Sequence, residues 1–129
     1  MDVRAVDFVL ISVSNLDRSI EFYRDVLGLH PETQWTEAEG PPPWVELKAG
    51  ATTIAIGVPP PDAPQPPYNG GISVALAVPD IGKAMDELRD KGVRVIQEAF
   101  ETPVCFMGLI ADPDGNLLWL HQRKDGTAG

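Results

Sequence analysis

Apolar and polar residues follow two different periods along this chain, and the two periods separate strands from helices. Short apolar runs rich in β-branched residues occupy residues 8–13 and 72–78, and turn-forming residues bound both runs, so each run predicts a strand. Each run leads into a stretch whose apolar residues recur every three or four positions, which predicts an amphipathic helix. The apolar stripes are Leu16, Ile20, Tyr23 and Leu27 in the first stretch and Ile81, Met85 and Leu88 in the second.

Polar residues and glycines mark the limits of both helices. Ser14 or Asn15 is suited to cap the first helix and Asp80 the second, because short polar side chains accept hydrogen bonds from the first free N–H groups. Gly28 and Gly92 follow the last apolar positions, where a glycine commonly ends a helix. We interpret both stripes as core-packing faces.

Extended segments follow each helix. The first half predicts strands at residues 32–36, 44–48 and 52–58, and the second half at residues 93–97, 104–111 and 117–122. Residues 112–115 (DPDG) predict a tight turn before the last strand. The order of elements is therefore β-α-β-β-β, twice.

The two halves are also similar in sequence, which indicates an internal repeat. Residues 13–21 (VSNLDRSIE) align with residues 78–86 (VPDIGKAMD) at an offset of 65 positions. Residues 59–67 contain six prolines in nine positions, as expected of a stiff linker, and prolines 41–43 interrupt the first half. We expect one domain over residues 1–129, divided as follows: a first module at about 4–58, a linker at 59–70, a second module at about 71–123 and a tail at 124–129.

Composition narrows the class of protein. The 129 residues suffice for one domain, and an apolar content of 43% supports a packed core. A net charge of −9 repels the nucleic acid backbone and is compatible with a cationic ligand. No apolar run approaches the roughly 18–20 residues of a membrane span, no signal peptide is visible, and the single cysteine fits a reducing compartment. These features predict a cytoplasmic protein that binds neither nucleic acid nor membranes.

Two motifs carry a family resemblance. Residues 15–29 (NLDRSIEFYRDVLGL) and residues 112–116 (DPDGN), together with the repeat, resemble the vicinal oxygen chelate superfamily, which includes glyoxalases, extradiol dioxygenases, fosfomycin-modifying enzymes and bleomycin-resistance proteins. The resemblance covers roughly residues 4–124. It implies an α+β fold in which two tandem βαβββ modules form cupped, half-open mixed sheets with helices outside. It also implies a ligand site on the concave face and a homodimer.

In metal-using members of this superfamily, the first and last strands of each cup supply the ligands. Carried onto this chain, the first-strand positions are Phe8 and Ser73. The last-strand positions are Trp119 and Ala55, or Ile54 if the register shifts. Phenylalanine, alanine and tryptophan offer no suitable donor to a divalent cation, and a serine hydroxyl is a poor substitute for imidazole.

The two histidines of the chain do not supply the missing metal ligands. His30 follows the first helix and is expected to lie outside the cup, and His121 is the only other histidine. No Asp or Glu occurs between Leu47 and Pro61, whereas a site of two histidines and one carboxylate needs all three. We expect no metal, no cofactor and no catalytic residue.

Five residues form the candidate ligand-binding set: Phe8, Ala55, Ser73, Trp119 and His121. Phe8 and Trp119 offer aromatic faces to a flat or cationic ligand, or else fill the cup as core. Ser73 would donate one hydrogen bond, or is merely a small residue near a strand end. His121 lies two positions after Trp119 and so on the same face, where it would act at the pocket mouth or remain a solvated side chain.

The leading interpretation is a metal-free protein that holds a small aromatic or cationic compound in an apolar cup, similar to bleomycin-resistance proteins. The alternative is an enzyme of the superfamily (a lyase, dioxygenase or thiol transferase) with a rearranged site, which would use His121 with Glu46 or Glu101. A third interpretation is a module for dimeric association without a ligand. The pattern leaves open which way Glu46, Trp35 and Trp44 face.

Overall fold

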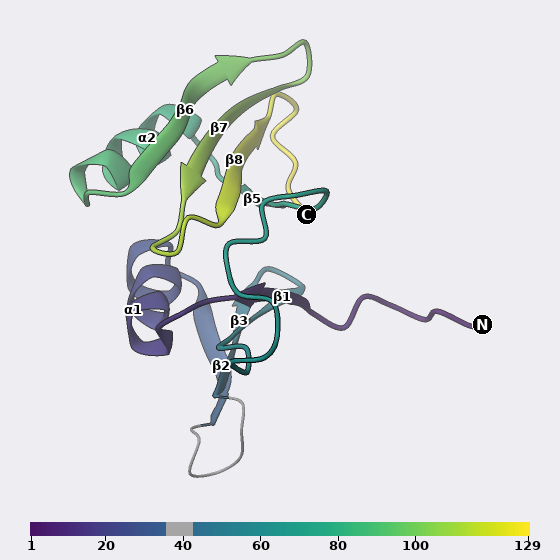
Figure 1. The fold of residues 1–129 in the computed structure, drawn as a ribbon. Coiled ribbons are helices and arrows are strands. Elements are labelled where there is room, and N and C mark those ends of the chain that lie inside the picture. Colours follow the sequence, from purple (N-terminus) through teal and green to yellow (C-terminus); the bar gives the residue numbers. More distant parts are fainter. Residues whose placement is uncertain (36–42) are drawn as a thin grey trace. The chain divides into compact units, whose positions relative to one another are not determined.

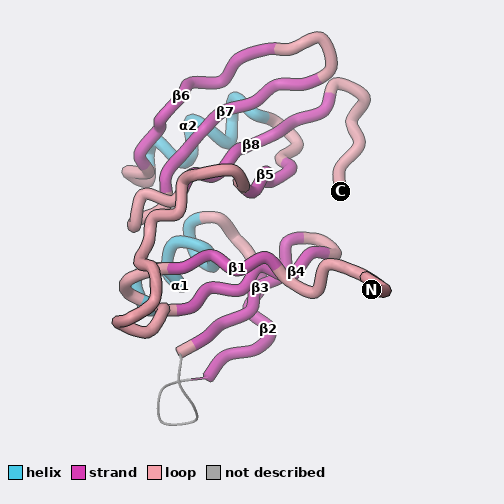
Figure 2. Tube along the Cα trace, turned by 45° about the vertical axis from the view of Figure 1, so that its right-hand side comes forward, coloured by secondary structure: helices cyan, strands magenta, loops and turns pink. Residues whose placement is uncertain are grey.

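The computed structural model describes residues 1–35 and 43–129, and its contacts divide the chain into two compact units. The first unit comprises residues 1–66 and the second residues 67–129. Each unit is built around its own four-stranded sheet with a helix on one face (Figures 1 and 2). The division falls inside the proline-rich segment expected to be a linker.

The first unit has the predicted order of elements. Its sheet runs β1-β4-β3-β2, with β1 parallel to β4 and the other neighbours antiparallel. The elements are β1 (Val9–Ser12), α1 (Leu16–Ile20), a π-helix η1 (Glu21–Val26), β2 (His30–Trp35), β3 (Trp44–Ala49) and β4 (Thr52–Gly57). The predicted strand end at residue 36 and the prolines 41–42 lie outside the described residues.

The second unit repeats the same topology. Its sheet runs β5-β8-β7-β6, with β5 parallel to β8. The elements are β5 (Val74–Ala77), α2 (Ile81–Asp90), β6 (Arg94–Glu101), β7 (Cys105–Ala111) and β8 (Leu117–Arg123). The predicted fold, two tandem βαβββ modules with mixed sheets, is confirmed.

Both helices begin at the predicted caps. The side chain of Asn15 accepts from the backbone N–H of Arg18, and that of Asp80 accepts from the backbone N–H of Lys83, each at 3.0 Å. The first N–H of α2 also donates to Gln122 Oε1 at 2.8 Å, so the helix start is tied to β8.

The first helix differs from the expected regular helix in its second half. From residue 21 it widens into a π-helix, with Leu27 N–H bonding to the carbonyl of Phe22. The wider turn brings two consecutive rings, Phe22 and Tyr23, into the core, where they meet edge to face at 5.1 Å. Gly28 then ends the helix with a φ of 77°.

Each helix packs on one face of its sheet. In the first unit the buried side chains of this face are Ile11, Val45, Leu47, Ile54 and Ile56, all paired in register. In the second unit Met85 of α2 lies over Gly108 of β7, beside buried Ile110, Leu118 and Leu120. Burial of these apolar faces is the main source of stability in each unit.

No helix of residues 1–35 and 43–129 is both long and apolar enough to cross a membrane.

Candidate functional site

The strand register fixes which residues share the face turned away from each helix, here called the helix-distal face. In the first unit this face carries Leu10, Ser12, Trp44, Glu46, Lys48, Thr53, Ala55 and Gly57. In the second unit it carries Ala75, Ala77, Gln97, Phe100, Met107, Leu109, Trp119 and His121. The alternation of side chains along a strand makes these sets unambiguous.

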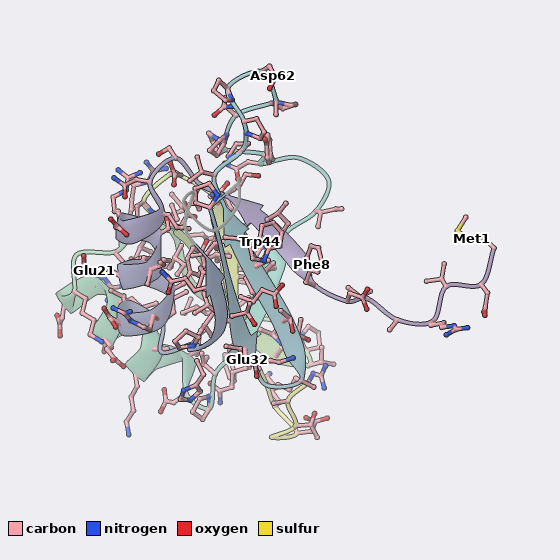
Figure 3. The ribbon with its side chains drawn as sticks, turned by 90° about the horizontal axis from the view of Figure 1, so that it is seen from below. Met1, Phe8, Glu21, Glu32, Trp44 and Asp62 are labelled. Atoms are coloured by element: carbon pink, nitrogen blue, oxygen red, sulfur yellow. The ribbon has the colours of Figure 1, made fainter. Side chains whose placement is uncertain are left out.

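An aromatic pair dominates the helix-distal face of the first unit. The rings of Phe8 and Trp44 meet edge to face with centroids 5.5 Å apart (Figure 3). Phe8 is 44% exposed, and Trp44 is half-buried. The indole ring lies over Gly57, whose missing side chain leaves room for it. The pair therefore presents apolar, partly exposed ring surface, the kind of surface that stacks on flat ligands.

Polar groups lie beside this pair. Trp44 Nε1 donates to Glu46 Oε1 at 3.0 Å, so Glu46 faces the same side as the rings. Lys48 follows on the same face, donates to Thr53 Oγ1 at 2.7 Å and lies 3.9 Å from Glu32. The face thus combines two aromatic rings with fixed charges.

The second unit has its own aromatic pair on the corresponding face. The rings of Trp119 and Phe100 meet edge to face with centroids 6.3 Å apart. His121 follows Trp119 on β8 and pairs with Met107 of β7. Ser73 is exposed and precedes β5, two positions before Ala75, which pairs with Trp119.

The predicted set therefore falls into two groups, one in each unit. Phe8 and Ala55 belong to the first unit, and Ser73, Trp119 and His121 to the second. Ala55 and Trp119 occupy equivalent positions, because each pairs with the second residue of the parallel first strand of its unit, Leu10 and Ala75 respectively. Trp119 and His121 share one face, as the alternation predicted.

His30 is expected outside the cup on sequence grounds, and that expectation stays a prediction. His30 is the first residue of β2 and pairs with Lys48 on the helix-distal face. The strand begins only two residues after Gly28, and a register shift follows between Pro31 and Thr33. His30 is exposed, at the outer strand of the sheet.

The donor set does not fit a metal. Phe8, Ala55 and Trp119 carry no donor atom suited to a divalent cation, and Ser73 carries only a hydroxyl. Among residues 1–35 and 43–129, no group of three His, Cys, Asp or Glu side chains is arranged to hold a metal ion.

Sequence reasoning leaves Trp44 and Phe100 out of the candidate ligand-binding set and names Glu46 only for the alternative enzyme site. Trp44 and Glu46 alternate on β3, but their facing depends on the pairing Glu46↔Ala55, which no local pattern reveals. Phe100 lies beyond the predicted end of its strand, because β6 continues to Glu101 through two register shifts. An alternation of large side chains at 44 and 46 was the only signal available.

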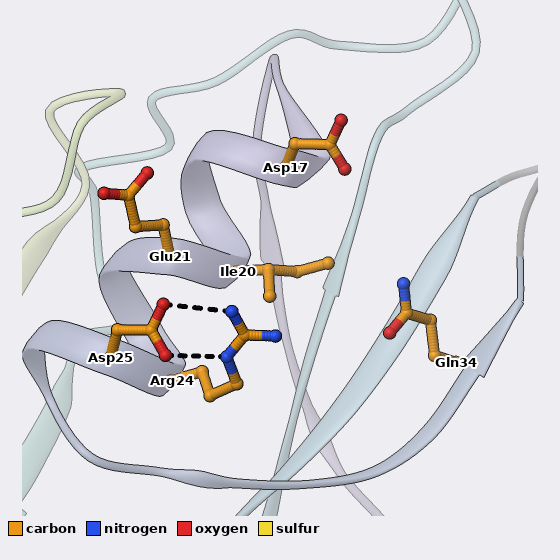
Figure 4. Close-up of a pocket in the computed structure, with 6 residues that line it drawn as sticks. All are labelled: Asp17, Ile20, Glu21, Arg24, Asp25 and Gln34. Carbon is orange, nitrogen blue, oxygen red and sulfur yellow. Dashed lines mark hydrogen bonds and ion pairs between the residues drawn. The ribbon is translucent and has the colours of Figure 1, made fainter.

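A separate hollow of about 320 Å³ lies on the other face, beside α1 and η1 (Figure 4). Asp17, Glu21 and Asp25 line it along the helix, and Gln34 of β2 faces them. Arg24 donates to Asp25 through Nε at 2.7 Å and Nη2 at 3.0 Å. These hydrogen bonds hold the pKa of the Asp25 carboxyl below its ordinary value.

A family model and a curated relative each match most of the chain. The family model described as the Glyoxalase/Bleomycin resistance protein/Dioxygenase superfamily matches residues 5–120. A curated relative, a probable lactoylglutathione lyase from Synechocystis, is 29% identical over 136 aligned positions, covering 90% of this chain and 95% of its own length.

Two solved structures share the fold. A member of the same superfamily from Sphaerobacter thermophilus has a TM-score of 0.80 at 24% identity, covering 94% of this chain and 98% of its own. An antibiotic binding protein from Streptomyces sp. CB03234 has a TM-score of 0.76 at 23% identity, covering 96% and 99%.

Proposed function

The chain belongs to the Glyoxalase/Bleomycin resistance protein/Dioxygenase superfamily, and on that premise we propose that it binds a small aromatic or cationic compound without a metal ion. The observation that carries the proposal is the aromatic pair on each helix-distal face, Phe8 with Trp44 and Phe100 with Trp119. Rings stand at or beside the positions where metal-using relatives place ligands. The antibiotic binding protein of the same fold gives a precedent for small-molecule binding on this scaffold.

Ring surface of this kind suits a flat or cationic ligand. Aromatic side chains bury large apolar areas at a small cost in conformational entropy, and tryptophan is the strongest cation–π partner. The net charge of −9 adds a long-range attraction for cations. Ser73 and His121 would supply polar contacts at the second sheet.

Thermal stability tests the proposal. A panel of arylalkylamines and neutral aromatics should contain compounds that raise the melting temperature by several degrees, since a ligand at a hundred times its Kd stabilises by roughly 2.7 kcal/mol. Phe8→Ala should weaken binding while leaving the fold intact, because the ring is 44% exposed and precedes β1. Tyr68→Ala is the matched control: the residue is 45% exposed and lies in the linker at residues 59–70. A panel without any stabilising compound would overturn the proposal.

Metal analysis tests the proposal that the protein binds its ligand without a metal ion. Purified protein should hold no stoichiometric Zn, Ni, Fe or Mn, because Phe8, Ala55, Ser73 and Trp119 cannot replace metal ligands. One equivalent of tightly held metal per chain, lost on His121→Ala, would contradict this.

The second candidate is a lyase, because the curated relative is named a probable lactoylglutathione lyase and is 29% identical over most of both chains. Turnover of lactoylglutathione, measured with and without added divalent metal, separates the candidates. Measurable turnover would favour the enzyme, with His121 as the first residue to replace.

We further propose that the chain forms a homodimer and that its two modules act as one domain. Each four-stranded sheet has two edge strands. In the second unit the apolar side chains of Ile72, Ile96 and Val104 are exposed. A two-fold partner would cover such edges and surface. Light scattering should give twice the chain mass of 14.0 kDa, and a monomer at micromolar concentration would contradict the proposal.

A further inference from the structure

The carboxylate of Glu46 occupies a defined place on the helix-distal face of the first unit. Its Oε1 accepts the hydrogen bond from Trp44 Nε1 at 3.0 Å, so the carboxylate lies at the edge of the indole ring. Across the sheet Glu46 pairs with Ala55, which presents only a methyl group beside it. The side chain is half-buried, and its charge is therefore less screened than that of a fully exposed acid.

A cation on the same face, Lys48, is already engaged. Lys48 follows Glu46 by two positions on β3, but its Nζ donates to Thr53 Oγ1 at 2.7 Å and lies 3.9 Å from Glu32. Among residues 1–35 and 43–129, Glu46 forms no salt bridge. The carboxylate thus keeps one oxygen, Oε2, for a cation from outside the chain.

Aromatic rings and a carboxylate complement different parts of one ligand. The Phe8–Trp44 pair offers ring surface to a flat apolar group, and a ring face also attracts a cation. A carboxylate fixed at the ring edge adds a charge-assisted hydrogen bond to an ammonium or guanidinium group attached to that flat group. A neutral ligand of the same shape would gain only the apolar contact.

We propose that Glu46 makes this face selective for cations, so that the preferred ligand is an aromatic compound that carries an alkylammonium or guanidinium group. The inference rests on the proposed binding function and narrows its ligand class. In the bound state the cationic group donates to Glu46 Oε2, while the flat group packs against Phe8 and Trp44. Oε1 stays bonded to the indole N–H.

Matched pairs of probes test the selectivity. Calorimetric titration compares tryptamine with tryptophol and phenethylamine with 2-phenylethanol, because each pair differs by an ammonium against a hydroxyl. Wild-type protein should bind the amines more tightly than the alcohols. Glu46→Gln keeps an oxygen acceptor for the indole N–H and removes the charge, so it should weaken amine binding by roughly three- to tenfold, the range of a half-buried ion pair, and leave alcohol binding unchanged.

A charge control and a fold control accompany the variant. Glu32→Gln removes the same charge from β2, beside Lys48 and away from the aromatic pair, and should leave the amine preference unchanged. Near-ultraviolet circular dichroism of Glu46→Gln should match the wild type, showing that Trp44 keeps its place.

The outcomes distinguish the proposed role of Glu46 from the proposed binding function. An amine preference that survives Glu46→Gln, or an equal loss for amines and alcohols, overturns the role of Glu46 while the binding function stands. Wild-type protein that binds neither member of either pair overturns both. Loss of the preference in Glu46→Gln alone supports the inference.

Discussion

The indole ring of Trp44 lies against the backbone of Gly57, so close that a methyl group on Gly57 would stand 3.0 Å from Trp44 Cε3. The two residues are paired partners on β3 and β4. The missing side chain on one strand thus determines how the large ring on the next one lies.

Gly57→Ala should therefore move the Trp44 ring. In a strand, replacing glycine by alanine is by itself stabilising, because glycine loses more backbone entropy on folding. Here the contact with the Trp44 ring should outweigh that gain and lower the free energy of unfolding by about 1–3 kcal/mol, the usual cost of overpacking. Urea unfolding and tryptophan fluorescence measure both effects. Gly70→Ala, where an added methyl meets nothing within 4 Å, is the control, and a stabilised Gly57→Ala would contradict the prediction.

Met85 and Gly108 form a similar contact in the second unit. A methyl group on Gly108 would stand 2.7 Å from Met85 Sδ. Gly108→Ala alone should destabilise by about 1–3 kcal/mol and Met85→Ala by about 2–5 kcal/mol. The double variant should be more stable than the sum predicts, by about 0.5–3 kcal/mol, because the new methyl group occupies part of the vacated volume. Strict additivity in a double-mutant cycle would refute the contact.

Asn69 ties the linker end to the turn before β8. Its amide donates to the carbonyl of Gly115 at 2.7 Å, and its carbonyl oxygen accepts from Leu117 N–H at 3.1 Å. Asn69→Ala removes both bonds and should cost about 1–2 kcal/mol in denaturant unfolding. Asn69→Asp keeps the acceptor but sets a carboxylate against a carbonyl, so it should be no better than alanine. Gln65→Ala, which removes bonds only within the linker, is the comparison.

Ser19 is fully buried on α1, and its hydroxyl has no hydrogen-bond partner among the described residues. Ser19→Ala should raise the free energy of unfolding by about 1 kcal/mol, because it removes an unsatisfied polar group and alanine is the better helix former. Ser14→Ala should not stabilise, since Ser14 Oγ accepts a hydrogen bond from Arg18. Thermal unfolding of the two variants measures both changes in stability, and a stabilised Ser14→Ala or a destabilised Ser19→Ala would contradict the prediction.

Arg24 controls the ionisation of Asp25. Its two hydrogen bonds lower the pKa of the Asp25 carboxyl below the ordinary 3.8, so Arg24→Gln should raise that pKa towards 3.8. Because the folded-state pKa is the lower one, the associated stability is present above the ordinary value and disappears as the pH falls through the folded value. NMR titration of the carboxyl measures the shift. Arg4→Gln, on the N-terminal segment, should leave it unchanged.

The fold could be predicted from local sequence signals, whereas the facing of the site residues depends on pairing between strands. The caps Asn15 and Asp80 bond to backbone groups three residues away, so sequence spacing alone identifies them. The facing of Glu46 depends on its partner Ala55, nine positions along the chain, and the aromatic contacts depend on ring placement across strands. The widening of the first helix at Glu21 also escapes a pattern built on a period of 3.6 residues.

The parallel pairing of first and last strands has a kinetic consequence. In the first unit Val9 pairs with Ile54, 45 positions away, and in the second Val74 pairs with Leu118, 44 positions away. Each unit closes a loop of almost the same length before its sheet is complete, and closure entropy grows only with the logarithm of that length. The two halves therefore face nearly equal topological barriers to folding, and differences in their rates will reflect their side chains.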